Sequence, residues 1–125
     1  MAKLILLLAV LLSCAMAIQF QTHDVVPYGL REAIFTPSIR WEFKNDDGHL
    51  GYLSLGSDGK INGFDNYNER RWRWDDHKKT LLFIAQNGKV SCTFTSFVVD
   101  FYGAWHIEGR FRFNNIGWRH YLIEQ

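Results

Sequence analysis

Tryptophans are the residues of this chain best suited to binding, because a flat apolar ring can stack on a ligand while its indole N–H donates a hydrogen bond. Trp72 and Trp74 are two residues apart, and Trp105 begins a later alternating run. In the loop before Trp72, Tyr67 and Asn68 add hydroxyl and amide groups beside that apolar surface. These five residues form a candidate site for a small apolar or ring-shaped ligand, with the tryptophans as stacking surfaces.

Arg110 is a sixth candidate, as a polar contact, although the alternation of its own segment places its side chain on the outer face. The loop 66–71, Asn-Tyr-Asn-Glu-Arg-Arg, is dense in hydrogen-bonding groups. The sequence leaves two interpretations of it open. The loop either contacts a polar ligand, or it forms a turn in which Asn68 has a positive φ and Glu69 pairs with a nearby arginine.

Groups for catalysis or metal binding form no recognisable constellation. Adjacent aspartates, Asp46-Asp47 and Asp75-Asp76, lie where turns are expected, and turns favour Asp for geometry alone. Cys92 is on the apolar face of its segment, where a thiol ionises poorly. We therefore expect no enzyme activity, no cofactor and no metal. The histidines, which lack partners at metal-ligand spacing, are His23, His49, His77, His106 and His120.

The first seventeen residues have the three-part layout of a secretory signal. Lys3 supplies the positive charge, residues 4–12 supply an apolar run, and Ala15-Met16-Ala17 supplies small residues at the cleavage positions. The run is too short for a permanent transmembrane helix. We predict a signal peptide over 1–17 and a secreted chain that starts at Ile18. Residues 11–14 also resemble a lipoprotein signal, so the alternative, for a bacterial source, is a lipid anchor at Cys14.

Charge and cysteine content narrow the class of protein further. The chain has 14 basic and 13 acidic residues, and removal of Lys3 with the signal leaves 13 of each. A formally neutral chain argues against nucleic acid or an anionic membrane surface as a bulk electrostatic partner. Cys92 would be the one cysteine left, so no intrachain disulfide can form and the core must hold the domain. The oligomeric state is left open.

Strands with one apolar and one polar face are predicted along most of the chain. Turn signals recur at 45–48, 56–59, 75–78, 87–88 and 114–117. Between them apolar and polar residues alternate, which is typical of half-buried strands. The predicted strands are residues 38–44, 50–55, 60–64, 70–75, 80–86, 89–97, 104–113 and 118–124.

Short links between these strands favour antiparallel neighbours, which predicts an all-β, up-and-down meander of about eight strands. Such a sheet buries one apolar face best as a closed or strongly curled barrel, here residues 38–125. The leader segment 18–37 includes a short predicted helix, 28–35, which either plugs one end of the barrel or belongs to a mobile leader. The aromatic rings expected inside are Trp41, Phe43, Trp72, Trp74, Phe94, Trp105, Phe111 and Phe113.

Two resemblances accompany this pattern. An eight-stranded meander with Trp41 on its first strand and Arg119 on its last resembles the calycin barrels, the lipocalins and avidins, where such a tryptophan packs beneath such an arginine. The chain departs from that family because Trp41 lacks a preceding Gly-x and no family loops or disulfides can be matched. The second resemblance is to a small β-module of proteins linked to bacterial glycosyltransferases, and it implies a saccharide ligand. It is carried by Asp58-Gly59-Lys60-Ile61-Asn62-Gly63, Asn66, Asn68-Glu69, Trp72, Leu81-Leu82-Phe83, Gly88 and Thr93-Phe94.

Two functions are consistent with these features. The first is an exported, non-enzymatic barrel that binds a small apolar or ring-shaped ligand in an aromatic-lined pocket. The alternative is a carbohydrate-binding or protein-interaction module, with a filled core and its function on surface loops.

Overall fold

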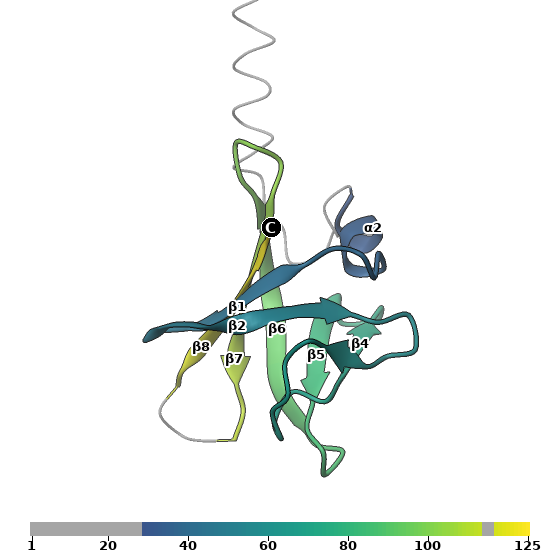
Figure 1. Cartoon of the computed structure of the whole chain (residues 1–125), viewed down its shortest axis with the longest axis vertical. Helices are drawn as coiled ribbons and strands as arrows, with labels where there is room; N and C mark the ends of the chain where they lie inside the picture. The colour runs from purple at the N-terminus through teal and green to yellow at the C-terminus, as the bar shows by residue number, and fades with distance from the viewer. Residues whose placement is uncertain (1–28, 114–116) are drawn as a thin grey trace, which may run out of the picture.

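The computed structural model describes residues 29–113 and 117–125, so the predicted signal peptide, Cys14 and most of the leader segment lie outside the described residues. One short helix precedes eight strands (Figure 1). The elements are α2 (Leu30–Ile34), β1 (Trp41–Asn45), β2 (Gly48–Leu55), β3 (Ile61–Asn62), β4 (Arg71–Asp75), β5 (Thr80–Ile84), β6 (Val90–Val99), β7 (Trp105–Phe111) and β8 (Arg119–Glu124).

The strands form one antiparallel sheet in the order β3-β2-β1-β8-β7-β6-β5-β4. Strands that are consecutive in the chain therefore pair with each other, except β3 with β4. The first strand, β1, also pairs with the last, β8. Between β3 and β4 the connection is one bridge, Lys60 with Arg71, beside which the Trp72 N–H donates to the Gly59 carbonyl at 3.0 Å. The fold is thus an up-and-down, nearly closed β-barrel, and the predicted fold class is confirmed.

The observed strands begin or end up to three residues from their predicted bounds, and two of these differences have a local cause. β3 has two residues rather than five, because Gly63 has a φ of 84° and turns the chain away. β6 extends to Val99, because a bulge between Phe94 and Ser96 changes the alternation and turns Phe97 into the core.

The barrel interior is filled with side chains rather than hollow. Trp41, Phe43, Phe83 and Phe94 are fully buried, and their rings interlock: Phe83 lies 4.9 Å from Phe94 and 5.8 Å from Phe43, centroid to centroid. The remaining buried apolar side chains of this cluster are Leu30, Ala33, Ile34, Leu53, Leu55, Ile61, Trp72, Leu81, Cys92, Phe97, Trp105, Ile107 and Leu122.

Gly109 allows β7 to approach β6 closely enough for this packing. A Cβ at this position would meet the Thr93 carbonyl oxygen and would lie 2.7 Å from the Phe94 Cα.

The prediction that Phe113 lies inside the barrel is wrong. β7 ends at Phe111, and the Phe113 ring is exposed and packs on the Phe111 ring, with 5.6 Å between the ring centroids.

The two ends of the barrel are different. α2 covers the end where β1 begins, and its Leu30 and Ile34 side chains are fully buried there (Figure 1). The opposite end, which we call the mouth, is where β1 and β7 end and β2 and β8 begin. The loop between β3 and β4 also lies there.

Across residues 29–113 and 117–125, no helix is long and apolar enough to cross a membrane.

Candidate functional site

A pocket of about 240 Å³ lies at the mouth of the barrel. Its wall combines apolar side chains, most of them aromatic, with amides and two titratable groups, and it includes no lysine or arginine. The apolar members are Phe43, Leu50, Phe64, Phe111 and Trp118, and the polar members are Asn45, Asn66, Asn68, Glu69 and His120. A wall of this composition suits a small ligand that has an apolar face and hydrogen-bonding groups.

Glu69 is buried in this wall without a counter-charge. Its side chain is 3% exposed, and its Oε2 atom has no hydrogen-bond partner among the described residues. Burial raises the pKa of this carboxyl to about 7. One of the two interpretations of the loop pairs Glu69 with an arginine, and no such ion pair is present among the described residues. Arg70 instead contacts Asp65, with 2.6 Å between Nη1 and Oδ1.

His120 is the second buried titratable group of the pocket. Its ring packs between Phe43, at 4.9 Å in an edge-on arrangement, and Phe111, at 5.0 Å. Nδ1 has no hydrogen-bond partner within the described part of the chain. Burial lowers the pKa of His120 to about 4, while the Asp46 carboxylate acts in the opposite direction. At neutral pH the imidazole is therefore uncharged.

The β3–β4 loop that carries Glu69 is fixed to the neighbouring strands by its backbone. The Gln86 N–H donates to the Tyr67 carbonyl at 2.9 Å, and the Ser91 hydroxyl donates to the Asn68 carbonyl. Within the loop, the Asn68 N–H donates to Asn66 Oδ1 at 2.9 Å. This turn does not require the positive φ predicted for Asn68, and Asn68 has none. The loop thus holds its polar side chains at the pocket before any ligand arrives.

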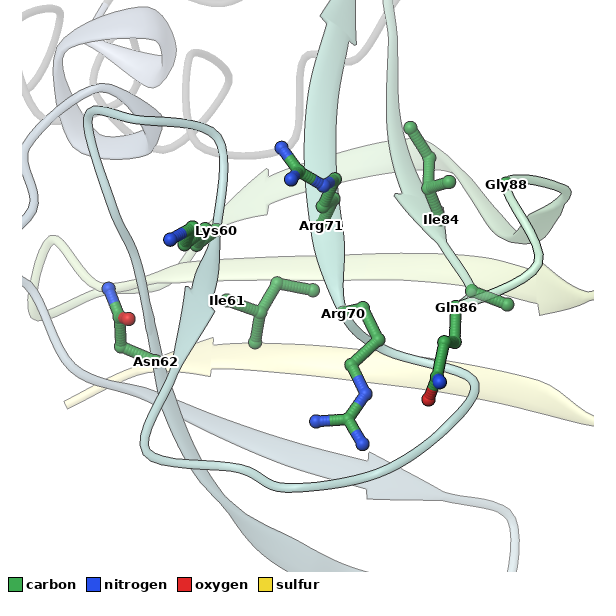
Figure 2. A pocket seen from close by; sticks show the side chains of 9 residues that line it. Lys60, Ile61, Asn62, Arg70, Arg71, Ile84, Gln86 and Gly88 are labelled. Atoms are coloured by element: carbon green, nitrogen blue, oxygen red, sulfur yellow. The ribbon is translucent and has the colours of Figure 1, made fainter.

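A second concave surface follows the seam between β3 and β4. This groove of about 580 Å³ lies on the outside of the barrel, and Lys60, Arg70 and Arg71 line it together with no acidic residue. Figure 2 shows Lys60 and Arg71 on the two sides of the seam, with Arg70 and Gln86 further along the groove. Neither Lys60 nor Arg71 has an acidic partner among the residues that the structure describes. The groove is therefore cationic although the whole chain is close to neutral.

The three tryptophans of the candidate site lie toward the end covered by α2, away from the mouth. Trp72 is buried, and its Nε1 donates to the Gly56 carbonyl at 2.8 Å. Trp105 is buried as well, and Trp74 is half-buried against Phe97, with 5.8 Å between the ring centroids. None of the five tryptophans is exposed, and Trp118 is the one that lines the mouth pocket.

The other three candidates are also dispersed. Asn68 lines the mouth pocket, which none of the three candidate tryptophans lines. Tyr67 lies in the same loop, but half of its side chain faces solvent. Arg110 is exposed on the outer face, opposite Thr93 of β6. The structure therefore does not bring the six residues together around one pocket.

Glu69 and His120 are the residues that sequence reasoning missed. A signal for His120 exists, because it is two residues before Leu122, which is fully buried on the same face of β8. Glu69 has no such signal, because its burial depends on the path of the β3–β4 loop.

Other candidate chemistry has structural explanations. Within residues 29–113 and 117–125, no three His, Cys, Asp or Glu side chains are grouped as metal ligands. Asp75 Oδ1 accepts the backbone N–H groups of His77 and Lys78, as expected of a turn aspartate. Cys92 is fully buried, and burial raises the pKa of its thiol.

Comparison with known protein families, curated proteins and solved structures finds no match for this chain. The eight-stranded, up-and-down barrel is compatible with a calycin-like architecture. The tryptophan–arginine contact of that family is absent, however. Trp41 is opposite Glu124 in the β1–β8 register, whereas Arg119 starts β8 at the mouth and is exposed.

Proposed function

We propose that this protein is a non-enzymatic β-barrel that binds a small ring-shaped ligand in the mouth pocket. One observation carries the proposal: two buried polar side chains, Glu69 and His120, each have an atom without a hydrogen-bond partner in an aromatic-lined pocket. Buried polar atoms without partners are costly, and a ligand that pairs with them recovers that free energy.

The size and wall of the pocket limit the ligand. A volume of about 240 Å³ is below the range of drug-sized sites, so it suits a single ring rather than a fused system or a long acyl chain. Phe64, Phe111 and Trp118 offer surfaces for the ring, and the Asn68 amide offers a donor and an acceptor at its edge.

The test is isothermal calorimetry with cyclohexanol, benzyl alcohol and methyl glucoside. We expect saturable binding of at least one of the three, and we expect Asn68→Ala to weaken it by about tenfold. Arg110→Ala is the matched control, because this exposed residue does not line the pocket. Equal effects of the two variants, or no binding of any ring by the intact chain, would overturn the proposal.

The seam groove favours a second candidate function, a surface module that binds an acidic saccharide. Its cations Lys60 and Arg71 have no acidic partner among the described residues, and the filled core leaves the outer surface for such a role. A sulfated disaccharide and its unsulfated parent test this candidate. We expect binding of the sulfated form alone, weakened about tenfold by Arg71→Gln. Arg73→Gln, on the same strand and also exposed, should have no effect; equal losses in both would argue against a defined site.

Export is proposed from the sequence of residues 1–17. Mass spectrometry of the mature protein should give an N-terminus at Ile18. A mature chain that begins with an acylated Cys14 would replace secretion with a lipid anchor. A relationship to the calycins stays a proposal supported by strand order.

A further inference from the structure

We propose that the ligand of the mouth pocket carries a protonated amine, with the Glu69 carboxylate as its counter-ion. This inference rests on the proposed function, because it names the chemical class of the ligand for the same pocket. It begins from Glu69, a residue that is 3% exposed and has one carboxyl oxygen without a hydrogen-bond partner among the described residues.

A buried carboxylate normally has a cationic or hydrogen-bonding partner, because an unpaired buried charge is strongly destabilising. Arg70 is next to Glu69 in the chain, but it pairs with Asp65 on the outside of the loop. No lysine or arginine lines the pocket. Since the described chain provides no cation for Glu69, the pocket is suited to a cation that arrives with the ligand.

The wall around Glu69 favours a cation over an anion or a neutral group. Phe43 and Phe64 pack edge to face at 5.3 Å, and Phe111 and Trp118 provide two further rings of the wall. The faces of aromatic rings attract ammonium groups. Glu69 beside these four rings forms an anionic, aromatic-walled pocket.

The neighbouring titratable groups do not oppose a cation. His120 on β8 is uncharged at neutral pH, because its pKa is lowered to about 4. Cys92 on β6 interacts with Glu69, and its thiol stays protonated because burial raises its pKa. Arg112 is exposed and does not line the pocket, and Asp46, near His120, adds negative charge at this end.

The affinity for an amine should depend on pH, because Glu69 must lose its proton to form the ion pair. Below the Glu69 pKa of about 7, binding an ammonium ion releases the carboxyl proton to solvent, and the carboxylate forms the ion pair. The affinity for an amine should therefore rise by about tenfold per pH unit up to pH 7 and then level off. Binding of a neutral ring should not follow this dependence.

The experiment compares cyclohexylamine with cyclohexanol, which have the same ring and differ in the polar group. At about pH 8 the full chain should bind the amine about tenfold or more tightly than the alcohol. Glu69→Gln should remove this preference, so that the variant binds the amine no more tightly than the alcohol. Asp65→Asn is the matched control, because it removes an acid of the same loop that is exposed and does not line the pocket.

The outcomes separate this inference from the proposed function. Equal binding of amine and alcohol would overturn the inference and leave the ring-binding pocket standing, whereas binding of neither would overturn both. An amine preference that survives in Glu69→Gln, or that Asp65→Asn removes equally, would also overturn the assignment to Glu69. A circular dichroism spectrum of each variant establishes that it is folded.

Discussion

Glu69 and His120 line the same pocket, and burial favours the neutral form of both side chains. It raises the pKa of Glu69 to about 7 and lowers the pKa of His120 to about 4. Each side chain is less than 5% exposed. Between about pH 4.5 and 6.5 the two shifts change the free energy of unfolding in opposite directions as pH rises. Glu69 lowers it, because the folded state keeps a proton that the unfolded state loses. His120 raises it, because the unfolded state holds a proton that the folded state lacks.

The Glu69→Gln variant should be more stable than the natural chain at high pH. The pKa of Glu69 is raised from 4.5 to about 7 in the folded state, so the free energy of unfolding falls as pH rises through this range. At pH 8 the ionised carboxyl lowers this free energy by about 3 kcal/mol, and a neutral amide removes that destabilisation. Urea unfolding at about pH 4 and pH 8 measures it. A variant that gains no stability at pH 8 would contradict the burial of an unpaired carboxyl.

The free energy of unfolding of the His120→Phe variant should depend on pH through Glu69 alone, because the opposing contribution of His120 is removed. The folded pKa of His120 lies below 6.5, so its contribution to stability rises with pH from about 4 to 6.5. Without it, the free energy of unfolding should fall steadily from about pH 4.5 to 7, whereas the natural chain should change little from these two groups. The same unfolding series tests this prediction, and parallel pH profiles for the two proteins would refute it.

Much of the fold was predictable because its determinants are local. Alternation and turn residues depend on near neighbours, so the eight strands could be predicted within a few residues of their observed ends. The bulge at Phe94–Ser96 and the end of β7 at Phe111 were not predictable, since each depends on the partner strand. Phe113 is consequently exposed rather than inside, and Phe97 is buried although it is an odd number of residues after the buried Phe94.

The candidate site was less predictable because it depends on contacts between distant segments. Alternation correctly placed Trp72 and Trp105 inside, but it could not show at which end of the barrel they lie. The position of Glu69 depends on hydrogen bonds of its loop to Gln86 and Ser91, far along the chain. Only Asn68 belongs to both the predicted residues and the pocket wall.

Gly109→Ala should strongly destabilise the barrel. The added methyl group would collide with the Thr93 carbonyl and the Phe94 Cα, which are backbone atoms that cannot move aside without distorting the β6–β7 pair. We expect a loss of about 3 kcal/mol in thermal or urea unfolding. Arg110→Ala, the exposed neighbour, should change stability by less than about 0.5 kcal/mol. Similar stabilities of the two variants would show that the strands are further apart than described.

Trp72→Phe and Trp118→Phe should separate a structural tryptophan from a binding one. Trp72 is buried and hydrogen-bonded to Gly56, so its replacement should cost about 2 kcal/mol and leave ring binding unchanged. Trp118 lines the mouth pocket and is only half-buried, so its replacement should weaken ring binding more than it lowers stability. The reverse pattern would move the binding site to the tryptophans near α2.

The most direct test of the ligand site is chemical-shift mapping of the backbone amides during titration with cyclohexylamine. Binding at the mouth predicts that the largest changes fall on Asn66, Asn68, Glu69, Phe111 and His120, with one saturation curve for all of them. Largest changes at Trp72, Trp74 and Trp105, or a spectrum that does not change up to high ligand concentration, would contradict the mouth as the binding site.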